Sequence, residues 1–176
     1  MTMKLPFALL LSGEPNCGKS TLAYHLVQKR LRNCLVIDGD KHREMQFLGE
    51  KLGFTRDDIM RNTDHVIKLA RFAQDQGFNV LIPQITPYLE QRQAMSKVLD
   101  NYWEVFVYAP KEVRMKRPNF TDSELIYEYG VPDLIVNTAN TIDTCVNEIL
   151  LMLNSWNIDE NTTLPDGLRV ERSDPR

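Results

Sequence analysis

The segment Gly13–Ser20 places the tightest constraint on how this chain can fold. It reads Gly-Glu-Pro-Asn-Cys-Gly-Lys-Ser and matches the pattern G-x-x-x-x-G-K-[ST] at every fixed position. The apolar run Phe7–Leu11 precedes it, and a helical pattern over Ser20–Leu31 follows it. Because a strand, a glycine-rich loop and a helix in this order form a phosphate-binding P-loop, we expect that loop here.

The residue types of this loop suit a nucleoside triphosphate. Its glycines let successive backbone N–H groups face the phosphates, and the helix N-terminus adds a favourable dipole. Lys19 would contact the β- and γ-phosphates, and the Ser20 hydroxyl would bind Mg²⁺. A plain glycine turn would not require all the matched positions. We therefore predict that ATP and Mg²⁺ bind at Gly13, Glu14, Pro15, Asn16, Cys17, Gly18, Lys19, Ser20 and Thr21.

Short apolar runs alternate with helical patterns along the rest of the chain. Near-continuous hydrophobic runs are typical of strands covered on both faces of a parallel sheet. After the first strand, they are Cys34–Ile37, Val80–Ile82, Val105–Tyr108 and Leu134–Val136, with helices expected at Asp57–Gln76, Leu89–Leu99, Lys111–Lys116 and Thr141–Leu153. This alternation predicts an α/β fold with a doubly wound, mostly parallel five-stranded sheet, the P-loop NTPase/kinase fold.

Size, charge and cysteine content narrow the class of protein. The 176 residues suffice for one domain, expected at 1–155, followed by a polar C-terminal tail at 156–176. The net charge of -3 disfavours long nucleic acid as a partner but leaves a short nucleic-acid end open. The apolar run before the P-loop is too short to span a bilayer, so we expect no membrane partner. Three cysteines without zinc-site spacing indicate reduced thiols and a cytoplasmic location.

Two carboxylates follow the second apolar run, in the segment Asp38-Gly39-Asp40. In an open α/β sheet, the carboxyl ends of the strands line the ligand crevice. There Asp38 would hold Mg²⁺ through water, and Asp40 would take the proton from an acceptor hydroxyl. A turn with solvated charges is the alternative. We interpret Lys19, Asp38 and Asp40 as catalytic residues, with Ser20 and Asp38 at the metal.

Several further patches, in order and spacing, resemble the adenylylsulfate (APS) kinase family. They are Gly13 to Thr21, Asp38-Gly39-Asp40 with Arg43, Leu52-Gly53-Phe54, Asn62, Ile85-Thr86-Pro87-Tyr88 with Arg92, Glu104-Val105-Phe106-Val107, and Glu112-Val113. The resemblance covers about residues 5–153. It implies an ATP-dependent kinase that phosphorylates the 3′-hydroxyl of adenylylsulfate, a small nucleotide-like acceptor.

The resemblance also implies where the acceptor binds. The Asp-Gly-Asp segment, and Asp40 within it, would lie at the acceptor and magnesium site. Arg43 and Asn62 would hold the acceptor nucleotide, and Phe54 would stack on its base. Ile85, Thr86 and Pro87 would line the same pocket. From the residues alone, Phe54 could equally belong to the core.

The acceptor half departs from the family pattern in three places. Thr63–His65 stand where the family has paired arginines, which suit an anionic acceptor. Leu89–Gln91 replace basic residues, and Pro83-Gln84 replace Ser-Phe. The lid after the fourth strand is short and, over Pro118–Gly130, acidic. These departures keep open a different acceptor (a nucleoside, a modified base or a polynucleotide 5′-hydroxyl) and a non-catalytic ATP-binding module.

A cluster of cations begins this lid, at Arg114, Lys116 and Arg117. Small P-loop kinases place arginines here that neutralise charge during transfer. The alternative is a solvated helix end, where cations suit the helix dipole. We predict that Arg117 is a fourth catalytic residue. The sequence does not report the oligomeric state, and a homodimer stays open.

Overall fold

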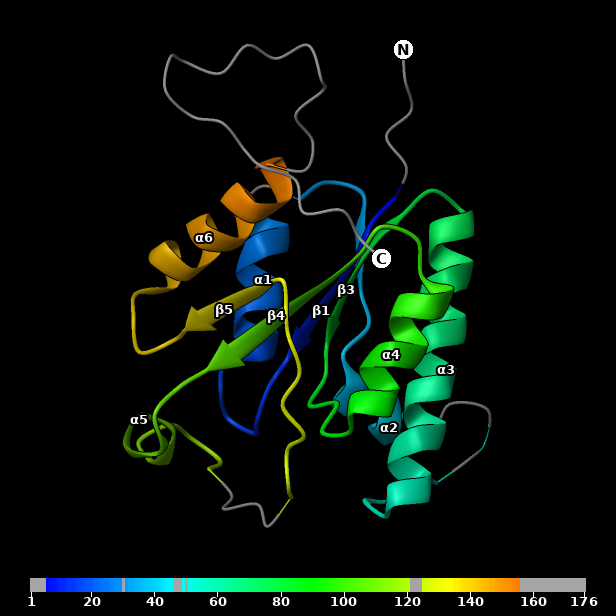
Figure 1. Cartoon of the computed structure of the whole chain (residues 1–176), viewed down its shortest axis with the longest axis horizontal. Helices are drawn as coiled ribbons and strands as arrows, with labels where there is room; N and C mark the ends of the chain where they lie inside the picture. The colour runs from blue at the N-terminus through cyan, green and yellow to red at the C-terminus, as the bar shows by residue number, and fades with distance from the viewer. Residues whose placement is uncertain (1–5, 30, 46–48, 50, 121–124, 156–176) are drawn as a thin grey trace.

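A five-stranded sheet in which all neighbouring strands run parallel forms the centre of the molecule (Figure 1). The computed structural model describes residues 6–29, 31–45, 49, 51–120 and 125–155. The strands are β1 (Ala8–Ser12), β2 (Cys34–Val36), β3 (Asn79–Pro83), β4 (Tyr102–Tyr108) and β5 (Leu134–Asn137). They lie in the order β2-β3-β1-β4-β5, so the P-loop strand β1 is central.

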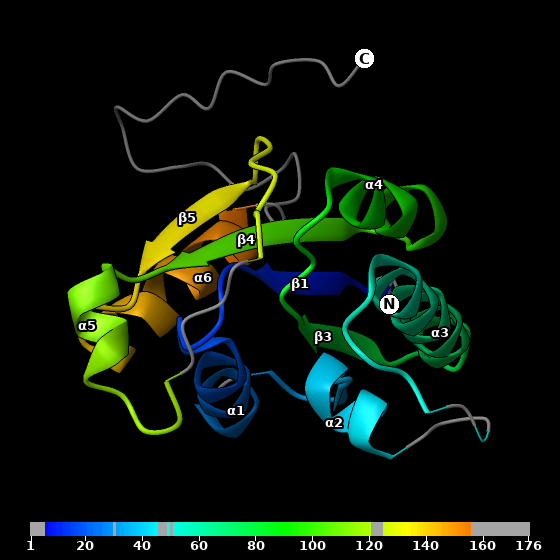
Figure 2. The same ribbon diagram turned by 90° about the horizontal axis from the view of Figure 1, so that it is seen from below.

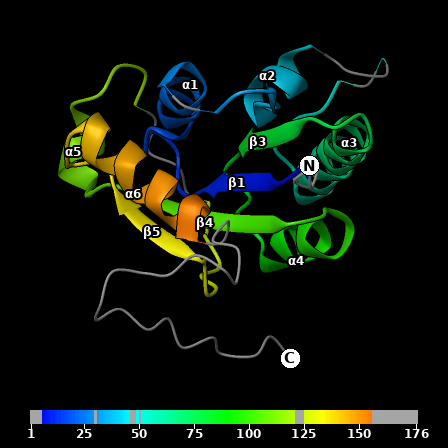
Figure 3. The same ribbon diagram turned by 90° about the horizontal axis from the view of Figure 1, so that it is seen from above.

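Helices cover both faces of this sheet. They are α1 (Lys19–Lys29), α2 (Gly39–Glu44), α3 (Arg56–Asp75), α4 (Leu89–Val98), α5 (Lys111–Met115) and α6 (Ile142–Ser155). Helices α1 and α6 pack on one face, and α3 and α4 pack on the other (Figures 1 and 3). The prediction of a doubly wound α/β fold is confirmed.

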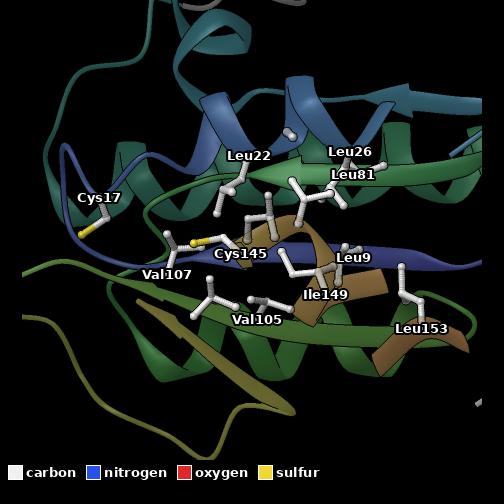
Figure 4. Packing of buried hydrophobic residues seen from close by; sticks show 14 residues of the cluster. Leu9, Cys17, Leu22, Leu26, Leu81, Val105, Val107, Cys145, Ile149 and Leu153 are labelled. Atoms are coloured by element: carbon white, nitrogen blue, oxygen red, sulfur yellow. The ribbon is translucent and has the colours of Figure 1, made fainter. Parts of the chain in front are cut away.

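The buried residues form two clusters that alternate along β1. Leu9 and Leu11 face α1 and α6, whereas Ala8 and Leu10 face α3 and α4. Figure 4 shows the first cluster, in which side chains of α1 and α6 meet those of the central strands. These four residues of β1 and the fifth, Ser12, are all 0% exposed. Because a strand packed on both faces has little room to move, β1 is a rigid base for the loop that follows it.

The expectation that every strand is covered on both faces is wrong at the edges of the sheet. Leu35 and Val36 of β2 are 45% and 39% exposed, and Ile135 of β5 is 61% exposed. An edge strand has one neighbouring strand, and the helix layers leave part of its surface open. An apolar run in the sequence therefore indicates a strand but does not show whether it is central.

The segment after β2 is helical. The sequence analysis treated it only as the end of a strand and did not predict this helix. Oδ1 of Asp38 accepts hydrogen bonds from the backbone N–H groups of Asp40 (3.1 Å) and Lys41 (3.3 Å), so Asp38 is the N-cap of α2. Gly39 begins the helix against Gln84, whose Cγ would lie 2.6 Å from a Cβ at position 39. The helix therefore holds the two carboxylates in fixed positions relative to the sheet.

The other expected helices are confirmed with small shifts at their ends. Thr141 caps α6, because its hydroxyl accepts a hydrogen bond from the backbone N–H of Thr144 at 3.2 Å. Gly77 follows α3 with a φ of 85°. In the described part of the chain, no helix is both long and apolar enough to cross a membrane. The polar tail 156–176 and lid residues 121–124 lie outside the described residues, and the domain boundary at 155 stays a prediction.

Candidate active site

The P-loop connects β1 to α1 at the carboxyl end of the sheet (Figure 2). Gly13 and Gly18 have φ values of 132° and 92°, which side chains rarely allow. A Cβ at Gly13 would lie 2.2 Å from the carbonyl oxygen of Val107 on β4. These two glycines therefore let the loop curl close to the sheet, as the motif predicts.

Lys19 begins α1 with its amine turned back over the loop. Its Nζ donates to the carbonyl oxygens of Gly13 (3.0 Å) and Glu14 (2.7 Å), and the residue is 8% exposed. Burial lowers the pKa of this amine from 10.5 to about 8, an effect partly offset by nearby acidic groups including Asp40 and Asp38. A buried ammonium at this position gains more from a phosphate than an exposed one would.

Ser20 and Asp38 form an oxygen-rich corner beside the loop. The Ser20 hydroxyl donates to Oδ2 of Asp38 at 2.7 Å, while Oδ1 caps α2. Hydroxyl and carboxylate oxygens suit Mg²⁺, which usually takes few protein ligands and completes its shell with phosphates and water. Among the described residues, no group of three His, Cys, Asp or Glu side chains could hold a metal ion.

A cavity of about 800 Å³ joins the P-loop to α2, the start of α3 and the segment after β3. The predicted donor residues that line it are Pro15, Asn16, Gly18, Lys19, Ser20 and Thr21, and the predicted acceptor residues are Asp40, Arg43, Phe54, Ile85, Thr86 and Pro87. Glu44, Ile59, Gln84, Pro118, Asn119 and Leu125 complete the described lining. One hollow therefore borders both halves of the predicted site.

Phe54 lies on the acceptor side of this cavity and not in the core. It is 76% exposed, and the guanidinium carbon of Arg43 lies 4.4 Å from the centre of its ring. Nη1 of Arg43 is also 3.4 Å from Oδ1 of Asp40. Arg43 covers one face of the ring, and the exposed remainder of the ring suits stacking on a planar base.

Asn62 is not among the described residues that line the cavity. It is 0% exposed; its side-chain amide donates to the carbonyl oxygen of Gly39 (3.2 Å), and its Oδ1 lies 2.7 Å from Nδ1 of His42. These contacts join α3 to α2 and so help to fix the position of α2. Cys17 is likewise turned into the core, where burial raises the pKa of its thiol.

The lid arginines brace the P-loop. Arg117 donates to the carbonyl oxygens of Asn16 (2.8 Å) and Thr138 (2.8 Å). Arg114 donates to the carbonyl oxygen of Pro15 at 3.3 Å and pairs with Glu14. Both arginines contact backbone carbonyls of the loop, and neither is among the described residues that line the cavity.

Sequence reasoning missed several contributors to the site, and two of them show how they could have been found. The Thr138 hydroxyl donates to the carbonyl oxygen of Cys17 at 2.7 Å, and Gln84 lines the cavity between α2 and α3. Both follow strands at the carboxyl edge of the sheet, which is the signal that could have found them.

Comparison with known proteins agrees with this geometry. The family model described as adenylylsulphate kinase matches residues 5–132. A probable adenylyl-sulfate kinase of Pyrococcus abyssi is 34% identical over 115 residues, which cover 63% of this chain and 64% of that protein. An adenylyl-sulfate kinase of Synechococcus sp. is 31% identical over 163 residues, which cover 82% of this chain and 92% of that protein.

A solved structure extends the likeness to three dimensions. The Mycobacterium tuberculosis APS kinase CysC, in complex with AMPPNP and APS, superposes with a TM-score of 0.73 and 26% identity. The match covers 85% of this chain and 98% of that one. Sequence and fold therefore lead to the same group of proteins. This chain belongs to the adenylylsulfate kinase family of P-loop kinases.

Proposed function

We propose that this protein transfers the γ-phosphate of ATP to the 3′-hydroxyl of adenylylsulfate. One observation carries the proposal: a single cavity is lined both by Lys19 and Ser20 of the P-loop and by Asp40, Arg43 and Phe54. Phosphoryl transfer requires a donor phosphate and an acceptor hydroxyl to be held together, because catalysis here is mostly positioning and charge stabilisation. The family membership of the chain supports the same reaction.

On the donor side, the P-loop N–H groups and Lys19 would hold the phosphates. Ser20 and Asp38 would hold Mg²⁺, which when bound neutralises charge on the phosphate oxygens. Arg114 and Arg117 would act one step removed, by keeping the loop carbonyls turned away from the phosphates. The catalytic role that the sequence suggests for Arg117 thus becomes a positioning role in this proposal.

On the acceptor side, Asp40 would accept the proton of the hydroxyl. It lies in the first turn of α2 with 66% of its side chain exposed, so its carboxylate can reach a bound acceptor. Phe54, with one face of its ring covered by Arg43, would stack its exposed face on the base, and Arg43 would supply a positive charge beside it. Ile85, Thr86 and Pro87 would line the same pocket. Asn62 would support α2 without contacting the acceptor.

A second candidate function is phosphorylation of a less anionic hydroxyl compound. Among the described residues on the acceptor side of the cavity, the charged ones are Asp40, Arg43 and Glu44, one cation and two carboxylates. Thr63–His65 stand where the family has arginines, and Asp64 there is engaged by Lys68 at 2.6 Å. An acceptor bearing a phosphosulfate prefers guanidinium partners, so a nucleoside or a 5′-hydroxyl end of a polynucleotide would meet less repulsion.

The deciding experiment is ATP turnover with Mg²⁺ in the presence of different acceptors. Adenylylsulfate is compared with nucleosides, nucleotides and 5′-hydroxyl oligonucleotides, and a Lys19→Ala variant controls for contaminating kinases. Product with adenylylsulfate alone supports the proposal. Product with another acceptor and none with adenylylsulfate supports the second candidate. Tight ATP binding without transfer to any acceptor contradicts both and favours a non-catalytic ATP-binding module.

A further inference from the structure

Arg92 of α4 joins three parts of the site from a buried position. It is 2% exposed, and its guanidinium lies between the segment after β3 and the segment that returns from the lid. Nη1 donates to the carbonyl oxygen of Thr86 at 2.6 Å, and Nη2 donates to that of Glu128. Nε lies 3.2 Å from Oε1 of Glu104. Both terminal nitrogens therefore donate to backbone carbonyl oxygens, whereas Nε pairs with the Glu104 carboxylate by charge and without hydrogen-bond geometry.

The carboxylate partner extends this contact to the base of the P-loop. Glu104 on β4 accepts a hydrogen bond at 3.0 Å from the hydroxyl of Ser12, the residue before Gly13. The Arg92 guanidinium also lies 4.9 Å from the centre of the Tyr127 ring. A buried ion pair adds little net stability, because desolvation of both charges offsets their attraction. Its location between loops instead favours a role in fixing their positions.

Thr86 is the wall residue that most needs such a restraint. Its φ is 42°, in the left-handed region that β-branched residues rarely occupy, and it is 1% exposed at the edge of the cavity. Strained backbone conformations persist only where the surroundings over-determine them. The hydrogen bond from Arg92 to the Thr86 carbonyl is one such determinant.

Glu128 ties the lid to the same wall. Its backbone N–H donates to the carbonyl oxygen of Pro87 at 2.8 Å, and its Oε2 accepts from the backbone N–H of Leu89 at 2.7 Å. Together with Arg92, these bonds join the acceptor loop, defined as residues 84–89, to the lid-return segment, defined as residues 125–130. The two segments are therefore held as one unit.

We propose that Arg92 is a positioning residue for the phosphate acceptor. By bonding to both Thr86 and Glu128, it fixes the position of the acceptor loop relative to the lid-return segment at the cavity. This inference rests on the proposed phosphotransfer for its kinetic effect, because the acceptor is expected to bind against Thr86. The residue itself does not contact the reacting atoms.

The kinetic test is Arg92→Lys, which keeps the buried positive charge but cannot reach all three oxygen atoms. We expect the KM for the acceptor to rise about tenfold or more, since misplaced binding groups have effects of this size, while the KM for ATP changes little. Arg71→Lys is the matched control, because Arg71 also bonds carboxylates and a backbone carbonyl but lies at the far end of α3. Unchanged acceptor KM, or equal changes for both substrates, would overturn the inference.

A second measurement does not depend on turnover. We expect hydrogen exchange of the Leu89 and Glu128 amides to accelerate together in Arg92→Lys, while α3 amides keep their wild-type rates. Acceleration of one amide alone, or of all amides equally, would overturn the inference. Absence of turnover in the wild type would instead count against the proposed function, and the exchange data would still decide the role of Arg92.

Discussion

Lys19 keeps a positive charge where burial opposes it, and this makes stability depend on pH. Burial lowers the pKa of its amine to about 8 in the folded protein, against 10.5 ordinarily. The cost of the buried charge is therefore fully present below pH 8 and disappears as pH rises toward 10.5. In metal-free, ligand-free protein, we expect the wild type to gain about 2 kcal/mol relative to Lys19→Met between pH 7 and 9.5.

Urea unfolding at the two pH values measures this difference. Lys97→Met, which removes an exposed lysine from α4, serves as the control and should show no pH-dependent gap from the wild type. A parallel pH dependence in the wild type and Lys19→Met would contradict the assignment of a lowered pKa to Lys19.

Asp40 is expected to act on the chemical step and not on ATP binding. Asp40→Asn removes the proton acceptor with little change in shape, so kcat should fall about 10²- to 10⁴-fold. The Kd for ATP should change little, because Asp40 lies on the acceptor side. Steady-state kinetics and calorimetry separate the two effects. Asp57→Asn, an exposed acid in the first turn of α3, should behave as wild type. A wild-type kcat in Asp40→Asn would remove the base assignment.

The residues of the site differ in how far the sequence could predict their positions. The P-loop is contiguous, and its geometry follows from its own glycines, so the motif was sufficient. Phe54 left two interpretations open, and only the exposed ring beside Arg43 decides against the core. Asn62 lies behind α2 because of its bonds to Gly39 and His42, which are distant in sequence. No local pattern contains that information.

At the scale of single elements, α2 depends on close packing at its first residue. A Cβ at position 39 would lie 2.6 Å from Cγ and 2.9 Å from Cδ of the buried Gln84 side chain. We expect Gly39→Ala to destabilise the protein by about 1–3 kcal/mol, as overpacking usually does. Because α2 carries Asp40, the KM for the acceptor should also rise. Lys41→Ala, at an exposed position of the same helix, is the control; if both variants have equal stability, the packing argument fails.

The elements also show which patterns the sequence can and cannot reveal. The strands were predictable because each is a short apolar run. Helix α2 was missed because its 6 residues are too few to display a helical period. In the sequence, Asp38 could be recognised only as a carboxylate at a strand end. Its role as a helix N-cap is shown by its hydrogen bond to a backbone N–H group, which the sequence does not reveal. The bracing of the P-loop by α5 and its following residues depends on contacts about 100 positions apart, such as Arg117 with Asn16.

For the whole molecule, the parallel sheet explains how distant segments form one site. Because the strands are parallel, the chain leaves each of them at the same edge of the sheet. The loops after β1, β2 and β3 therefore meet there (Figure 1). The P-loop, α2 and the acceptor loop therefore surround one cavity although up to about 75 positions separate them in sequence. The sequence predicts the fold class. The strand order, which brings these loops together, depends on how the whole sheet packs.

Binding at this shared edge should stabilise the entire fold. The P-loop follows a fully buried strand, and unfolding would abolish the site, so a ligand that binds the folded chain raises the free energy of unfolding. With Mg²⁺ and the non-hydrolysable analogue AMPPNP at about 100 times its Kd, we expect a gain of about 2.7 kcal/mol. For a chain of this size, that gain corresponds to a rise in Tm of roughly 5–10 °C.

Thermal unfolding monitored by circular dichroism measures the shift, and calorimetry supplies the Kd. The Lys19→Ala variant should fold but show a much smaller shift at the same concentration, because it lacks the buried cation of the proposed donor site. Adding an acceptor to the wild type with AMPPNP should raise Tm further, since both halves of the cavity would then be filled. An equal shift in the wild type and Lys19→Ala would mean that the nucleotide binds elsewhere. The chain would then have the fold of the family but not the donor site proposed here.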